Sequence, residues 1–109
     1  AEREELFRRM VFNVYNREMD DHTKNFSFLV TEDAAMAICS APGLDAAAQG
    51  ATLQMRRFLI DRVGMADHEA GMLLSLAGDL RICQCVDPNK TCRMEVALSL
   101  LEKLGYVFP

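Results

Sequence analysis

Asp20 and Asn25 are the residues whose types and spacing could do chemistry, and they lie in the segment MDDHTKNFSFLV, Met19–Val30. Phosphoryl-transfer enzymes use an Asp that accepts the proton of the attacking hydroxyl, followed by an Asn that binds Mg²⁺. Asp20 and Asn25 have the residue types and the spacing that this chemistry uses. The alternative is a solvated loop that caps a preceding helix, in which His22 makes only loop hydrogen bonds.

Cysteine and histidine offer a second possible chemistry, that of a zinc site. The chain has 4 cysteines and 2 histidines, but no Cys-x-x-Cys or His-x-x-x-His spacing supports metal ligation by His22 or His68. The sequence therefore predicts reduced, mostly buried thiols and no bound cofactor, with a divalent metal expected only if the chain is active. The cysteines are Cys39, Cys83, Cys85 and Cys92.

Length and composition limit the classes of protein that the chain can belong to. With 109 residues, of which 50% are hydrophobic, it fits a single domain over residues 1–109 with an ordinary core. A net charge of -4 argues against nucleic-acid binding. No apolar run approaches the roughly 20 residues that span a bilayer, and the charged start AEREELFRRM is not a signal peptide. We expect a cytoplasmic protein without membrane contact.

The elements that would position these residues follow from hydrophobic periodicity. Apolar residues recur at helical spacing from Glu2 to about Met19, which predicts an amphipathic helix before the polar loop. FSFLV, Phe26–Val30, and AMAICS, Ala35–Ser40, read as strands, and the three residues from Thr31 to Asp33 would form a tight turn between them.

A long helix is predicted next, with Asp45 as its N-cap and Gly64 as its stop. Its inner stripe would be Ala48, Ala51, Met55, Phe58 and Leu59. A second helix should run from about Asp67 to Ala77, with inner residues Ala70, Leu73, Leu74 and Ala77.

The clearest hairpin prediction joins the β-prone run Leu80–Val86 to a strand in which Cys92, Met94 and Val96 alternate with polar residues. ALSLLEKLG then suggests a short last helix closed by Gly105. The order of elements predicts a single α+β domain, an antiparallel sheet of about four strands with helices packed on one face.

Residues 4–30, with FRRMVFNV, DDHTKN and FSFL, resemble the catalytic-loop region of HipA-type serine/threonine kinases. The resemblance implies the roles given above for Asp20 and Asn25. A glycine-rich phosphate loop, a nucleotide-binding Lys and a second magnesium-binding Asp are not found around this motif, and a kinase needs all of them.

Residues 34–105 resemble the C-terminal part of the acetamidase/formamidase family, metal-dependent hydrolases of small amides, most specifically in SLAGDLRICQCVD. In a complete amidase Asp79 and Arg81 could form an active-site pair; a plain ion pair or turn contact is the alternative. The Gly-, His- and Asp-rich segments that resemble a metal site in that family belong to its N-terminal part and do not occur here.

These resemblances predict a folded fragment or a recombined or engineered chain, joined near Val30 to Ala34, without turnover of its own; a natural fusion or a misread gene is the runner-up. Two other functions stay open: an amide hydrolase that acts with another chain, and a residual kinase-like nucleotide and magnesium binder. We also expect a homo-oligomer, most simply a two-fold dimer, with the hairpin face as one possible contact. The alternative is a monomer whose first helix and last segment complete the core.

Overall fold

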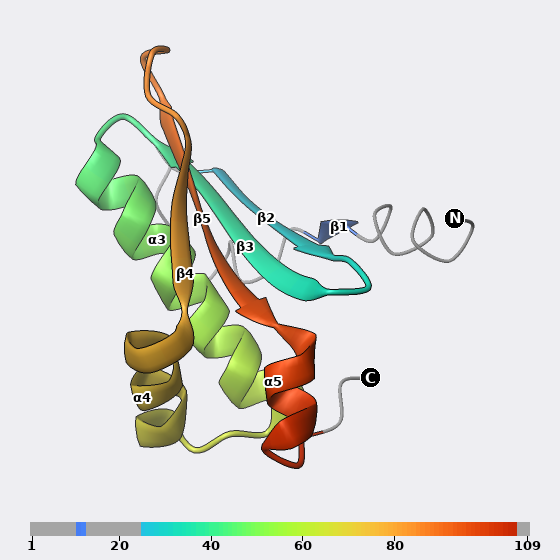
Figure 1. The fold of residues 1–109 in the computed structure, drawn as a ribbon. Coiled ribbons are helices and arrows are strands. Elements are labelled where there is room, and N and C mark those ends of the chain that lie inside the picture. The colour runs from blue at the N-terminus through green and yellow to red at the C-terminus, as the bar shows by residue number, and fades with distance from the viewer. Residues whose placement is uncertain (1–10, 13–24, 107–109) are drawn as a thin grey trace.

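The strands β2 (Asn25–Val30) and β3 (Ala34–Ala41) form the first hairpin of the computed structural model, which describes residues 11–12 and 25–106 (Figure 1). Their register places Phe28 opposite Ala37. The turn is closed by Thr31, whose N–H donates to the Ala34 carbonyl at 2.9 Å and whose hydroxyl oxygen accepts from the Asp33 and Ala34 N–H groups. The predicted hairpin and its tight turn are therefore confirmed.

The second hairpin joins β4 (Asp79–Gln84) to β5 (Lys90–Ala97). β5 pairs with β3, so the antiparallel sheet has the strand order β1-β2-β3-β5-β4. Along β5 the burial alternates, and Cys92, Met94 and Val96 are all buried, as the sequence pattern predicts. These three side chains are buried within the single chain.

The strand β1 (Val11–Phe12) corrects the first predicted helix. Val11 pairs with Leu29 and Phe12 with Phe28, so these two residues are extended at the edge of β2. Val and Phe both favour strands, and the open edge of β2 supplies hydrogen-bond partners for their backbone N–H and C=O groups. The remainder of that predicted helix lies outside the described residues.

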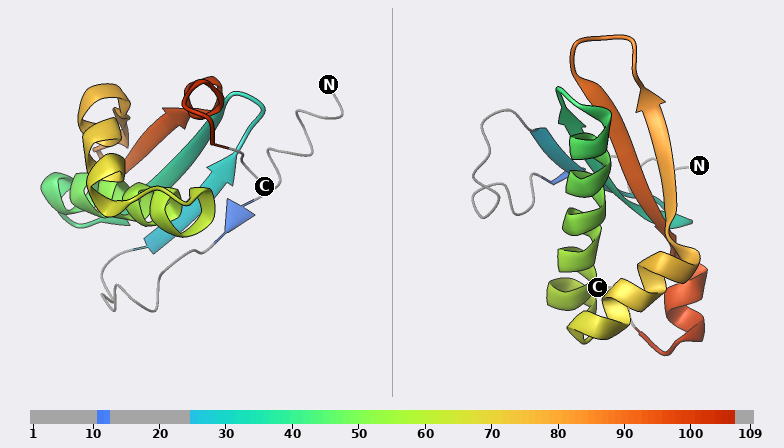
Figure 2. Two further views of the ribbon diagram at one scale, coloured as in Figure 1. Left: turned by 90° about the horizontal axis from the view of Figure 1, so that it is seen from below. Right: turned by 90° about the vertical axis from the view of Figure 1, so that its left-hand side faces the viewer.

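The four helical segments of the described residues lie on one face of the sheet or at its end (Figure 2). α3 (Leu44–Phe58) packs over β3 and β5 and continues into a π-helical turn, η1 (Leu59–Val63). η1 ends at Gly64, whose φ of 93° is left-handed, as predicted for a glycine stop. α4 (Asp67–Ala77) has the predicted bounds, and α5 (Leu98–Lys103) follows β5 directly.

Two details of these helices differ from the prediction. The N-cap of α3 is Gly43, and Asp45 lies in the first turn instead, where its charge still suits the helix dipole. Ala77, the last residue of α4, is exposed, and the buried residues of this helix are Ala70 and Leu74. α4 also begins without a hydroxyl cap: the Glu69 carboxylate accepts from the Ala66 N–H at 3.1 Å.

The main hydrophobic core of the described residues lies between the helices and the sheet, beside a smaller cluster of Ala41, Ala47 and Cys92. The main core contains Phe26, Phe28 and Val30 of β2 together with residues of β3, β5 and the helices. The fold is thus a single compact α+β domain with an antiparallel sheet and helices on one face, as predicted. The buried helix residues of this core are Ala51, Met55, Phe58, Leu59, Ala70, Leu74 and Leu101.

Candidate functional site

Of the kinase-like pair Asp20 and Asn25, the structure describes only Asn25. Asp20 and His22 lie outside the described residues. Asn25 is the first residue of β2, is exposed, and lies opposite Ser40 of β3. Its position at a strand end leaves its side chain amide accessible to solvent, which fits either a loop-end residue or a weak metal contact.

Asp79 and Arg81 form an ion pair on the outer face of β4. The Arg81 Nε donates to the Asp79 Oδ2 at 2.9 Å, and the side chains of Arg81 and Asp79 are both more than half exposed, at 55% and 52%. On the neighbouring strand Arg93 pairs with Glu95, whose carboxylate lies 3.8 Å from the Arg81 Nε. The Asp79 hydrogen bond, followed by the charges of Asp79 and Glu95, raises the pKa of the Arg81 guanidinium.

The sheet keeps Asn25 apart from the Asp79–Arg81 pair. Asn25 lies on β2 and Asp79 on β4, and β3 and β5 separate these strands. They also lie toward opposite ends, because Asn25 is level with Ser40 and Thr91 whereas Asp79 is level with Glu95 and Met36. Asn25 and the Asp79–Arg81 pair therefore do not form one site.

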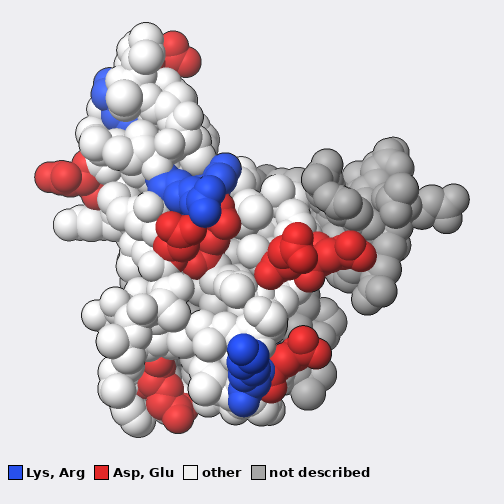
Figure 3. Space-filling view, in the orientation of Figure 1, with Lys and Arg blue, Asp and Glu red and all other residues white. Residues whose placement is uncertain are grey.

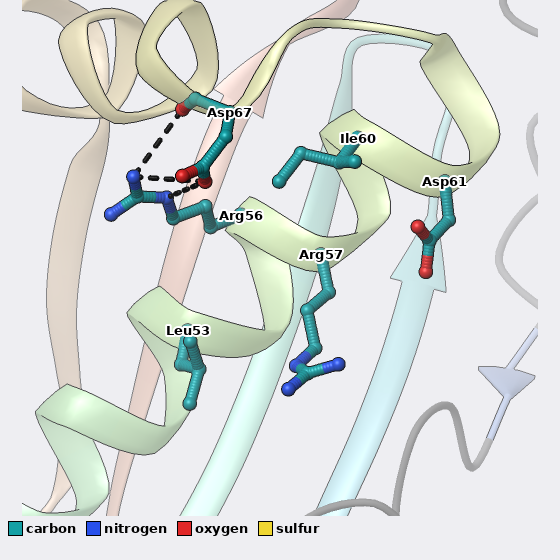
Figure 4. Close-up of a pocket in the computed structure, with 6 residues that line it drawn as sticks. All are labelled: Leu53, Arg56, Arg57, Ile60, Asp61 and Asp67. Carbon is teal, nitrogen blue, oxygen red and sulfur yellow. Dashed lines mark hydrogen bonds and ion pairs between the residues drawn. The ribbon is translucent and has the colours of Figure 1, made fainter.

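Sequence reasoning missed a surface hollow of about 430 Å³ along α3 and the start of α4 (Figure 4). Arg56 is held there by Asp67, with Nε–Oδ1 at 3.0 Å and Nη2–Oδ1 at 2.9 Å. The sequence signal for this ion pair was weak, since eleven positions separate the two residues. No His, Cys, Ser, Thr or Lys of the described residues lines the hollow, so its carboxylates, Asp61 and Asp67, are the reactive groups it offers. Its lining is Leu53, Arg56, Arg57, Ile60, Asp61 and Asp67.

Gln54 is a second residue that the sequence reasoning overlooked. It is completely buried, and its Nε2 donates to the Ser27 carbonyl of β2 at 2.8 Å, while its Oε1 accepts no hydrogen bond from the described residues. A polar residue beside Ala51 and Met55 on the inner stripe was the available signal. The bond ties α3 to β2, which is a structural role.

Metal-ligating side chains do not gather in the part of the chain that the structure describes. Within residues 11–12 and 25–106, no three His, Cys, Asp or Glu side chains are placed to hold a metal ion. His68 is exposed in the first turn of α4. No disulfide joins the four cysteines, all of which are described; Cys39 and Cys92 are buried, but Cys83 and Cys85 are exposed, contrary to the prediction of mostly buried thiols. The described residues therefore do not fit a divalent metal.

Charges on the open face of the sheet are mixed. Figure 3 shows basic side chains beside acidic ones over β4 and β5, and a separate acidic group over the turn between β2 and β3, where Glu32 and Asp33 lie.

Among the described helices, none is both long enough and apolar enough to cross a membrane.

The sequence of this chain matches a known protein family. Residues 1–95 match the family described as the HipA-like C-terminal domain. The chain belongs to the HipA-like C-terminal domain family. This match includes the predicted segment 4–30 and continues through both hairpins of the HipA-like chain. The sequence matches no curated protein.

Parts of solved acetamidase structures are similar to this chain. The acetamidase of Bacillus halodurans is 47% identical, with a TM-score of 0.67, over 78% of this chain and 29% of its own. The predicted acetamidase/formamidase of Thermoanaerobacter tengcongensis is 29% identical, with a TM-score of 0.66, over 75% of this chain and 27% of its own. The acetamidase of Yersinia enterocolitica is 29% identical, with a TM-score of 0.66, over 69% and 23%.

Both predicted resemblances are thus confirmed, and they share residues. The HipA-like match covers residues 1–95, and the Bacillus halodurans acetamidase match covers 78% of the chain. Together these regions exceed the length of the chain, so the two matches overlap. The chain spans less than a third of the length of each of these three acetamidases.

Proposed function

We propose that this HipA-like chain is a structural module of an amide hydrolase of the acetamidase/formamidase class, without turnover of its own. The observation that carries the proposal is the 47% identity to the Bacillus halodurans acetamidase over 78% of this chain, with a TM-score of 0.67. Identity at that level over a whole sheet-and-helix unit supports a common origin, and the unit corresponds to 29% of the acetamidase.

The chemistry of the described side chains supports a scaffold role. Amide hydrolysis needs an activated water or an activated nucleophile. The predicted active-site pair, Asp79 and Arg81, is an ion pair with both side chains more than half exposed. The Asp79 carboxylate is hydrogen-bonded to the Arg81 guanidinium and open to solvent, so it lacks the desolvated surroundings in which enzymes hold a general acid or base. In this proposal the reacting groups belong to other segments of the hydrolase.

Ammonia release from formamide and acetamide tests the proposal. The purified chain, supplemented with Zn²⁺, Mn²⁺ or Ca²⁺, should give the rate of buffer alone, whereas the Bacillus halodurans acetamidase serves as the active control. Chelator-sensitive release by the chain alone would overturn the proposal. Release that requires co-expression with the acetamidase segment that this chain does not cover would instead identify a hydrolase assembled from two chains.

Mixed ancestry is part of the same proposal: a recombined or engineered chain, joined near Val30 to Ala34, although the HipA-like match itself runs through this junction to residue 95. This junction coincides with the β2–β3 turn, a position where segments can be exchanged without breaking a strand. Sequencing the gene in its source genome tests it. A natural, uninterrupted reading frame through codons 30–34 would exclude a laboratory recombinant and leave a natural fusion.

A residual magnesium–nucleotide binder is the competing candidate, and the family match over residues 1–95 favours it. A ligand that binds only the native state raises the melting temperature. A thermal shift with Mg²⁺ and ATP that disappears in Asn25→Ala would establish this function over the scaffold role. Labelled phosphate incorporation that disappears in Asp20→Ala would extend it to a kinase; we expect neither result.

A further inference from the structure

β4 is an edge strand with an open side. It ends the order β1-β2-β3-β5-β4, and among the described residues no strand lies beyond it. Residues Asp79–Cys83 are all exposed. The backbone groups on the outer side of such a strand form a template for pairing with another strand.

The two faces of β4 differ in chemistry. Leu80 lies opposite Met94 and Ile82 opposite Cys92, so both point to the face of the sheet on which the helices lie. α3 covers β3 and β5 but does not reach over β4, as the right-hand view of Figure 2 shows, and Leu80 and Ile82 remain 45% and 57% exposed.

The opposite face of β4 carries charges that the directly opposed residues of β5 do not complement. The register places Asp79 directly opposite Glu95 and Arg81 directly opposite Arg93. Like charges in directly opposed positions are unfavourable. The ion pairs of this face run instead along each strand or diagonally, as Asp79–Arg81, Arg93–Glu95 and Arg81–Glu95.

We infer that β4 pairs antiparallel with β4 of a second copy of this chain, about a two-fold axis at Leu80. In this register Asp79 lies opposite Arg81 of the second copy, and Arg81 opposite its Asp79. The two Leu80 side chains meet on the helix side. Ile82 falls opposite Gly78, which has an extended backbone with φ -70° and ψ 138° and no side chain to obstruct it.

Neighbouring registers lack this complementarity. A two-fold axis at Arg81 would oppose the two guanidiniums, which is unfavourable. An axis at Ile82 would place Arg81 opposite Cys83 and Asp79 opposite Cys85, leaving both charges without an opposed partner. The sequence Asp-Leu-Arg at the start of β4 is thus self-complementary in one register only, and a two-fold axis is the commonest symmetry of protein pairs.

Charge reversal tests both the partner and the register. Arg81→Glu places Asp79 opposite a carboxylate in the homodimer, and Asp79→Arg places Arg81 opposite a guanidinium; each variant alone should dimerise roughly tenfold or more weakly. An equimolar mixture of the two should dimerise again, since every opposed position then carries opposite charges. Arg62→Glu, an exposed reversal outside β4, should dimerise as the wild type does.

Sedimentation equilibrium over micromolar concentrations measures the outcome. The wild type should approach twice the chain mass of 12.2 kDa. Folding of the variants is checked by circular dichroism; Arg81→Glu should fold well, because the introduced carboxylate would face Arg93 across the β4–β5 pair. A wild type that stays at 12.2 kDa throughout, an Arg81→Glu variant that dimerises like the wild type, or a mixture that stays dissociated would each overturn the inference. None of these results depends on amide hydrolysis.

Discussion

Phe28 and Phe58 lie with their ring centroids 4.4 Å apart and their planes tilted by 34°. Phe28 belongs to the segment in which the HipA-like motif was recognised, and Phe58 ends α3 within the acetamidase-like segment. The ring pair therefore joins both segments in one core. Whatever the history of the chain, its two parts are energetically one unit, because neither ring could be buried without the other segment.

Removing either ring should destabilise the whole domain. Phe58→Ala, like Phe28→Ala, should lower the free energy of unfolding by about 3–5 kcal/mol, since each leaves a cavity in a packed core. Leu104→Ala, at a position 52% exposed, should change it by less than about 0.5 kcal/mol. Urea unfolding followed by circular dichroism gives both values. Equal effects at the core and control positions would contradict this account of the core.

Gly50 should resist substitution although it lies inside α3, where Ala is the better helix former. A Cβ at this position would lie 2.4 Å from the Cys39 Sγ and 3.1 Å from the Phe26 ring, so the Cys39 side chain or the helix would have to shift. We expect Gly50→Ala to lower the melting temperature and Cys39→Ala to restore part of the loss in the double variant. Gly43→Ala, where nothing lies within 4 Å, is the matched control. Additive effects of the two substitutions would refute the contact.

The four thiols should react in two classes. Cys83 and Cys85 are exposed and should be labelled rapidly by a thiol reagent, whereas Cys39 and Cys92 are buried and should react only as the domain unfolds. Mass spectrometry of the labelled peptides identifies each class. Under denaturing, non-reducing conditions all four should titrate, and a smaller number would reveal a disulfide.

Stability should fall at alkaline pH in part through Cys92. Burial, followed by the neighbouring Cys83, raises the pKa of the Cys92 thiol. The raised pKa means that the folded state favours the neutral thiol, so this contribution is present below the unfolded-state pKa of about 8.5 and is lost as pH rises through the folded-state pKa. Urea unfolding at a series of pH values above about 8 should show the decline. In Cys92→Ala the decline should be shallower; an unchanged slope would exclude Cys92 as its source.

Local structure followed from the sequence where short-range patterns decide it. The bounds of α4, the glycine stop at Gly64 and the alternation of Cys92, Met94 and Val96 were all readable, because helix ends and strand faces depend on neighbouring residues along the chain. The Asp79–Arg81 ion pair was readable for the same reason, since residues two apart in a strand share a face.

Tertiary structure decided what depends on distant residues. Helical spacing around Val11 and Phe12 predicted a helix, yet the open edge of β2 pairs with both as a strand. The Arg56–Asp67 ion pair required α4 to fold back on α3. Only the strand order placed β4 at the edge of the sheet, put like charges opposite each other on β4 and β5, and separated Asn25 from Asp79. Strand order and register are set by which apolar faces can be buried together, and that energy is not encoded in any short window of sequence.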